Sequence, residues 1–334
     1  MYKDRIPLYQ KLEEMRKSKV LVYVTGDRRG LETRIHPETH DFFVQHLDKI
    51  GDVKKISLYL YTTGGLTLAA WSLINLIRQF CEELEIIIPS KAHSAGTLMC
   101  LAANKIIMTK QATLGPIDPS VQNPLNPQIQ GAPPDAKVPV SVEDINAYND
   151  FARETLGVDA NLNDAFTNLV KYVHPLVLGH AYRARGQIRM LGEQLISNQI
   201  QDKDKIENIL KFLCSESGSH DYTINRKEAK ERLGLPIENP DDQLYNIIIN
   251  IYNDISNELE LNKPYNPNII LGSEKETNYR FCRALIESIE GGHHYFVSEG
   301  KLVKIKIAGP QGIAQEAVQD FRYVEEWRYD ELSR

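Results

Sequence analysis

No apolar stretch of the sequence approaches the roughly 18 residues that a membrane-spanning helix needs. Residues 1–17 are charged and amphipathic, with Leu8, Leu12 and Met15 at helical spacing, so they predict an N-terminal helix and not a signal peptide. We therefore expect a cytoplasmic protein without an integral membrane span.

Cysteine is scarce, and the four cysteines show no spacing typical of zinc or redox sites: Cys81, Cys100, Cys214 and Cys282. They predict buried thiols in a reducing compartment. The adjacent pair His293 and His294 would point to opposite faces of a strand, so we expect no metal site there.

An excess of positive charge is also missing, because 39 Lys and Arg face 45 Asp and Glu and the net charge is −6. With no basic stripe carrying interleaved aromatics, this excludes a typical nucleic-acid binder. The phosphate-binding pattern Gly-x-x-x-x-Gly-Lys is absent too, so the sequence predicts no bound cofactor and no built-in use of ATP.

The most informative segment runs from residue 84 to residue 119. An apolar strand ends at Pro89, and Ser94 follows at a predicted strand-to-helix turn, where several hydrolase folds expose a nucleophilic hydroxyl. The alternative is that Ser94 only caps the next helix. Because Ala92 stands two residues before the serine, this is not the Gly-x-Ser-x-Gly elbow of the α/β-hydrolases.

A second strand-to-helix turn precedes the first by about thirty residues. The strand 55–61 leads to Gly64 and Gly65 and then to an apolar helix over 66–80. Two glycines leave backbone amides bare, so we expect the amides of Gly65, Gly64 and Ala95 to bind a developing oxyanion. The alternative is an ordinary turn.

Three segments of the sequence are distinctive: Tyr61-Thr62-Thr63-Gly64-Gly65, Ser94-Ala95-Gly96-Thr97-Leu98, and Leu114-Gly115-Pro116-Ile117-Asp118-Pro119. Together they resemble the serine dehydrogenase proteinase family of the signal peptide peptidase A class, which has the Clp protease/crotonase fold. A weaker fourth match is Ser219-His220-Asp221-Tyr222. The resemblance covers about residues 18–235 and implies a serine peptidase that forms a homo-oligomer.

The sequence offers two kinds of base that could activate Ser94, a lysine and a histidine. The resemblance implies a Ser-Lys dyad and points to Lys137, which lies in the apolar stretch 136–140. Neutral lysine at pH 7 costs roughly 4.6 kcal/mol unless burial lowers its pKa, and Asp135 would oppose that change. A histidine is the alternative: His93 is adjacent to Ser94 but its side chain should diverge, and His174 and His220 read as structural.

We expect a serine endopeptidase that cleaves peptides or unfolded proteins through an acyl-enzyme. Two other functions stay open. An acyl-CoA enzyme of the crotonase type would use the same oxyanion geometry with a carboxylate as its catalytic acid or base, and Ser94 counts against it. A catalytically idle member of the fold would serve as a scaffold or binding protein.

The rest of the pattern predicts the architecture. Strands at 19–24, 55–61, 84–89 and 105–108 alternate with helices, which indicates an α/β fold with a parallel sheet. A long loop spans 121–139, and helices occupy much of 142–257. We expect an N-terminal helix over 1–17, a peptidase domain over 18–262 and a small α+β domain over 263–334. The last would contain helices at 276–290 and 322–334 and a hairpin that turns at 298–300.

Overall fold

The computed structural model describes the chain except residues 119, 122, 134–135, 155–161, 309–313 and 331–334. It divides into two compact units. Unit 1 comprises Met1–Leu114 and Asn225–Arg334, and unit 2 comprises Gly115–Ile224.

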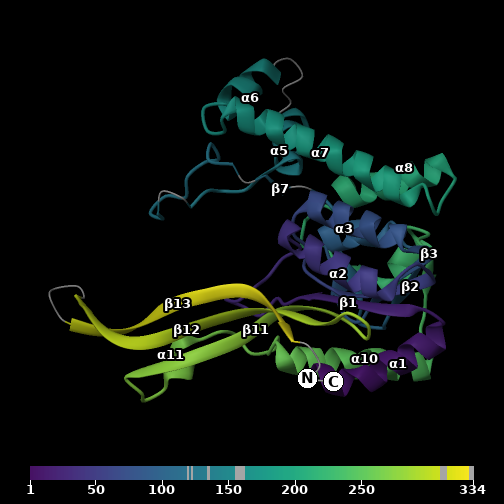
Figure 1. Cartoon of the computed structure of the whole chain (residues 1–334). Coiled ribbons are helices and arrows are strands. Elements are labelled where there is room, and N and C mark those ends of the chain that lie inside the picture. Colours follow the sequence, from purple (N-terminus) through teal and green to yellow (C-terminus); the bar gives the residue numbers. More distant parts are fainter. Residues whose placement is uncertain (119, 122, 134–135, 155–161, 309–313, 331–334) are drawn as a thin grey trace. The chain divides into compact units, whose positions relative to one another are not determined.

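Unit 1 is built around an eight-stranded sheet with the strand order β10-β5-β3-β2-β1-β11-β12-β13 (Figure 1). The first five strands run parallel to their neighbours, and the last three are antiparallel. In chain order the strands are β1 (Lys19–Thr25), β2 (Val53–Tyr61), β3 (Cys81–Ile88), β5 (Lys105–Met108), β10 (Ile237–Glu238), β11 (Glu276–Ser288), β12 (Gly292–Ala308) and β13 (Ala314–Asp330). The parallel half confirms the expected α/β fold with crossover helices.

Helices cover both faces of this sheet. The helices of unit 1 are α1 (Tyr2–Arg16), α2 (His40–Ile50), α3 (Thr67–Gln79), α4 (Ala95–Cys100), α9 (Arg226–Glu231), α10 (Asp242–Glu258) and α11 (Pro267–Leu271), with a 3-10 turn η1 (Pro37–Thr39). In Figure 1, α1 and α10 lie side by side below the sheet, and α2 and α3 lie above it. The expected N-terminal helix is confirmed as α1.

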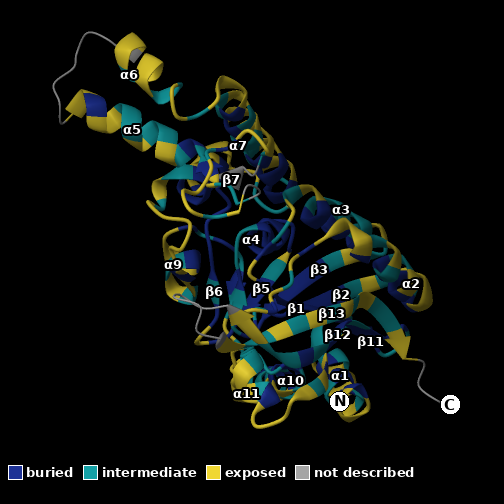
Figure 2. Cartoon of the chain, turned by 90° about the vertical axis from the view of Figure 1, so that its left-hand side faces the viewer, coloured by how far each residue is buried: buried dark blue, intermediate teal, exposed yellow. Residues whose placement is uncertain are grey.

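The parallel strands are buried because helices cover both of their faces. The last five or six residues of β1, β2 and β3 are all buried, and these strands are mostly dark blue in Figure 2. Such strands read as continuous apolar runs, which is why the sequence revealed them. Tyr9 and Leu12 of α1 and Ile248 and Ile251 of α10 pack in one core cluster with the sheet.

The C-terminal part departs from the expectation. Residues 276–288 form β11 and not a helix, and β12 runs unbroken through residues 298–300, where a hairpin turn was expected. The segment expected as a helix from residue 322 belongs to β13 as far as Asp330. These residues form strands because of their pairing: β12 forms hydrogen bonds with both β11 and β13. These strands extend the main sheet, so residue 263 does not mark a change of sheet.

Unit 2 is mainly helical. It contains α5 (Val142–Glu154), α6 (Leu162–Leu169), α7 (Pro175–Ile196) and α8 (Lys203–Lys211), followed by a π-helical turn, η2 (Phe212–Glu216). The short strands β7 (Ser120–Val121) and β8 (Val140–Ser141) pair antiparallel. They enclose the long loop that the sequence predicted. The strand β9 (Ile224–Asn225) stands at the division between the units.

Helices in the described part of the chain are too short or too polar to cross a membrane.

Candidate functional site

Ser94 lies at the turn between β4 (Lys91–Ala92) and α4. Its backbone has φ 51° and ψ −117°, a conformation that L-residues rarely adopt. An ordinary N-cap serine has extended backbone angles and accepts a hydrogen bond from the first turn of the helix. Ser94 has neither feature, because its side chain makes no capping bond. Ser94 is half-buried, and its hydroxyl is therefore held in a strained turn without a capping role.

Gly64 lies directly against Ser94. A Cβ added to Gly64 would stand 2.8 Å from Ser94 Cβ and 3.1 Å from the carbonyl oxygen of His93. The φ of Gly64 is 115°, which also favours glycine. The structure thus brings the two predicted turns together, although thirty residues separate them in the sequence.

The three predicted oxyanion donors differ in their hydrogen bonds. The Gly64 amide donates to Thr62 Oγ1 at 2.9 Å, so it is already engaged. Within the described part of the chain, neither the half-buried Gly65 amide nor the Ala95 amide donates a hydrogen bond. Gly65 and Ala95 are therefore better placed than Gly64 to supply free N–H groups.

The imidazole ring of His93 is engaged in a hydrogen bond. Its Nε2 forms a hydrogen bond of 2.8 Å with Thr113 Oγ1 of β6 (Thr113–Leu114). Its backbone N–H donates to the carbonyl of Thr62. Both contacts agree with the expectation that His93 is a structural neighbour of Ser94.

Lys137 belongs to unit 2, whereas Ser94 belongs to unit 1. Lys137 forms an isolated antiparallel bridge with Gln128 and is half-buried. Among the described residues, no hydrogen-bond or ion-pair partner of its amine is found. Val138 beside it is 41% exposed, so the apolar stretch around the lysine is only partly covered.

A pair in unit 2 was missed in the sequence. His220 Nδ1 lies 2.9 Å from Asp118 Oδ1, and this hydrogen bond is the main cause that raises the pKa of His220 above its ordinary value. Asp118 is buried, while the His220 side chain is half exposed. Together with Ser141, they line a cavity of about 540 Å³. Both residues fall in segments that carried the family resemblance, which was the available signal.

A cavity of about 710 Å³ opens elsewhere in unit 1, between the start of α1 and the strands β11 and β12. Ser94, Gly64 and Gly65 do not line it. Beside it, the buried Arg5 binds the carboxylates of Asp254, Glu258 and Glu287 and fastens α1 to α10 and β11.

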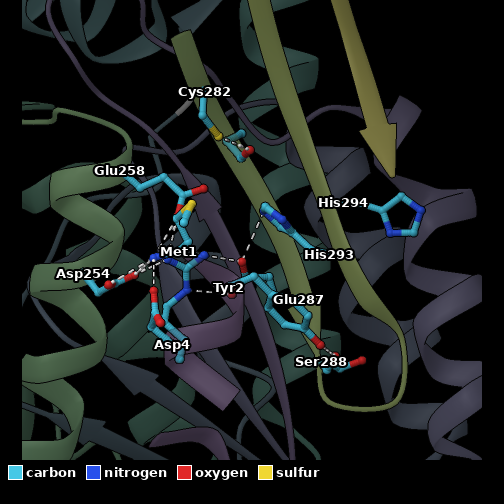
Figure 3. A network of polar contacts seen from close by, with 12 residues as sticks. Met1, Tyr2, Asp4, Asp254, Glu258, Cys282, Glu287, Ser288, His293 and His294 are labelled. Carbon is cyan, nitrogen blue, oxygen red and sulfur yellow. Dashed lines mark hydrogen bonds and ion pairs between the residues drawn. The ribbon is translucent and has the colours of Figure 1, made fainter. Parts of the chain in front are cut away.

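Of the adjacent histidines on β12, His293 lines this cavity. Figure 3 shows both side chains. His293 points towards Glu287, and His294 points away from it to bond His46. The expectation that the two rings face opposite sides of the strand is confirmed.

Residues 39–147 match the family model of ClpP-like SDH-type serine proteinases. The resemblance to the serine dehydrogenase proteinase family is confirmed over this segment. The matched segment contains Ser94, Gly64, Gly65 and Lys137. With the parallel sheet and its crossover helices, this match supports the Clp protease/crotonase-like fold.

Two relatives come from Methanocaldococcus jannaschii. The uncharacterized protein MJ0137 is 31% identical over 199 residues, which cover 58% of this chain and 58% of that protein. The uncharacterized protein MJ1495 is 28% identical over 182 residues, covering 54% and 51%. The chain therefore matches little more than half the length of these relatives.

Solved structures with a similar chain trace include proteases. A mutant of the 1510-N membrane-bound stomatin-specific protease with a substrate peptide has a TM-score of 0.36 and 18% identity, covering 67% of this chain and 78% of that one. A ClpP1 mutant from Listeria monocytogenes has a TM-score of 0.37 and 16% identity, covering 71% and 99%.

Proposed function

We propose that this chain is a serine endopeptidase in which Ser94 is the nucleophile. One observation carries the proposal. Ser94 lies on a strained strand-to-helix turn, its hydroxyl makes no helix-capping hydrogen bond, and the residue lies directly against the Gly64-Gly65 loop. Strain at a serine is expected where the turn must present the hydroxyl to a substrate. A serine that only caps a helix does not need a strained backbone.

The reaction follows from these roles. As the Ser94 hydroxyl attacks a peptide carbonyl, a base removes its proton and then returns that proton to the leaving amine. The ester that forms between Ser94 and the acyl group is hydrolysed by water. The negative charge on the carbonyl oxygen is stabilised by the Gly65 and Ala95 amides, and Gly64 supports the loop.

Lys137 is our first candidate for the base. Support comes from its place within the matched segment and from the family resemblance. The amine must be neutral to accept a proton, so it needs to lose water when a substrate binds. Its half-buried position is compatible with that need.

His220 is the second candidate for the base, favoured by its hydrogen bond to Asp118. A carboxylate on Nδ1 fixes the ring tautomer and leaves Nε2 able to accept a proton, as the third member of a catalytic triad does. In this version Asp118 is the residue that orients the histidine.

Casein cleavage by the purified chain distinguishes these versions, with Ser94→Ala, Lys137→Met and His220→Gln compared at equal folded concentration. We expect Ser94→Ala to lose at least about 1000-fold in kcat/KM. A similar loss in Lys137→Met alone assigns the base to lysine, and a similar loss in His220→Gln alone assigns it to histidine. Undiminished cleavage by Ser94→Ala would contradict the proposal.

The proposal also covers the substrate, the compartment and the assembly of the chain. The substrate is a peptide or an unfolded protein, no cofactor or ATP is consumed, and four free cysteines suit a reducing cytoplasm. A homo-oligomer is supported by exposed apolar side chains on α7, since Leu176, Tyr182 and Met190 are 68%, 74% and 48% exposed. At 100° per residue they fall within about 120° of the helix circumference.

A further inference from the structure

Thr62 connects the two turns of the candidate site. It follows the last residue of β2 and is fully buried. Its backbone N–H donates to the carbonyl of Lys91 at 3.1 Å, and its carbonyl accepts from the N–H of His93 at 3.1 Å. The main chain of Thr62 is therefore bonded to the residues that lead into Ser94.

The side-chain hydroxyl of Thr62 acts on the glycine loop. Its Oγ1 accepts a hydrogen bond from the Gly64 amide at 2.9 Å and lies 3.3 Å from the Gly64 carbonyl oxygen, to which it donates. Its second acceptor position takes the hydroxyl of Thr25 at 2.7 Å. A hydroxyl has one donor and two acceptor positions, so all three are used.

The Gly64 carbonyl and the Gly65 amide belong to one planar trans peptide, so they point in opposite directions. The carbonyl is held by Thr62 and by the N–H of Ile35, at 2.9 Å. Fixing the carbonyl therefore fixes the direction of the free Gly65 amide.

The Thr62 methyl group makes the third contact. A Cβ added to Gly96 in α4 would stand 2.4 Å from Thr62 Cγ2, so the methyl group fills the space beside that glycine. Through its main chain, hydroxyl and methyl group, one residue sets the glycine loop against the first turn of α4.

We propose that Thr62 is a positioning residue that aims the Gly65 amide at the oxyanion and sets it in register with Ser94. The inference rests on the proposed function. Thr62 touches neither substrate nor reacting atoms, and it acts through the peptide between Gly64 and Gly65. The Thr25 hydroxyl supports it from the end of β1.

Two substitutions separate the hydroxyl from the methyl group. Thr62→Val keeps the shape and removes the hydroxyl, and we expect kcat to fall about 10- to 100-fold with KM changed less than about 3-fold. Thr62→Ser restores the hydroxyl, and we expect it to recover most of kcat. The matched control is Thr109→Val, because Thr109 is also buried and donates to a backbone carbonyl, that of Pro89, at 2.7 Å.

A purely structural role for Thr62 predicts a different result. Thr62→Val and Thr109→Val would then lose kcat alike, in proportion to their loss of folded protein, and that outcome would overturn the inference.

Hydrogen exchange of the Gly64 amide, followed by NMR, tests the hydrogen bond from this amide to Thr62 Oγ1 without any substrate. Exchange should be faster in Thr62→Val than in wild type and near wild type in Thr62→Ser and Thr109→Val. Unchanged exchange in Thr62→Val would refute the claim that the Thr62 hydroxyl fixes the glycine loop. If the wild-type chain cleaves nothing, the proposed function fails, and this exchange measurement still decides whether Thr62 fixes the loop.

Discussion

At the scale of single residues, the site depends on three backbone positions with unusual angles. Ser94, Gly64 and Gly65 all have positive φ, and only the two glycines adopt such angles without strain. The strain at Ser94 lowers the stability of the fold, and the neighbouring contacts must offset it. A stability measurement can detect that strain independently of activity.

Replacing Ser94 by glycine should stabilise the chain relative to replacing it by alanine. Glycine relieves the strained φ and alanine does not, so we expect Ser94→Gly to unfold with a free energy about 1–3 kcal/mol higher than Ser94→Ala. Thermal or urea denaturation measures the difference.

The matched control is Ser72 in the middle of α3. There Gly should be the less stable substitute, by about 1 kcal/mol relative to Ala. Equal stabilities for Ser94→Gly and Ser94→Ala would show that the turn is unstrained in solution.

At the scale of elements, the hairpin of β11 and β12 is fastened to α2 by buried polar groups. His46 Nδ1 bonds Ser288 Oγ at 2.7 Å, and His46 Nε2 bonds His294 Nδ1 at 3.0 Å. Burial lowers the pKa of His46 to about 3 and that of His294 to about 4, and the nearby Lys49 and His293 add to the effect. Both rings are therefore neutral in the folded chain near pH 7.

This contact makes stability depend on pH in a defined direction. The unfolded histidines have a pKa near 6.5, above their folded values, so the unfolded chain binds more protons as the solution becomes acidic. Their contribution is complete above about pH 6.5 and is lost progressively as the pH falls through the folded pKa of His294, about 4, towards that of His46, about 3. We expect Tm to fall over that range, measured by calorimetry.

His294→Gln should make this fall shallower, because it removes one titrating ring and retains a hydrogen-bonding side chain. His40→Gln on the same helix, where the side chain is 42% exposed, is the control and should follow wild type. A His294→Gln protein with the wild-type slope would refute the assignment.

The same scale shows what the sequence could and could not predict. The buried parallel strands and the Ser94 and Gly64-Gly65 turns were predictable, because each depends on a short local pattern. The strands β12 and β13 were not, since strands of 17 residues are far longer than the usual five or six, and β12 pairs with both β11 and β13. Asp118 and His220, 102 positions apart, meet only through the fold.

At the scale of the whole molecule, the proposed nucleophile and oxyanion donors belong to unit 1, and both candidate bases belong to unit 2. The sheet of unit 1 therefore accounts for the nucleophile and the oxyanion loop without the helical unit. The identity of the base is a separate question, and the central claim is that Ser94 is an activated nucleophile.

The most direct test of that claim is to treat the full chain with a fluorophosphonate and to locate the modification by peptide mass spectrometry. We predict one phosphonyl group per chain, on Ser94, with casein cleavage lost in proportion to labelling, and no modification in Ser94→Ala. Labelling of another residue, or full cleavage activity in a chain labelled at Ser94, would contradict the account.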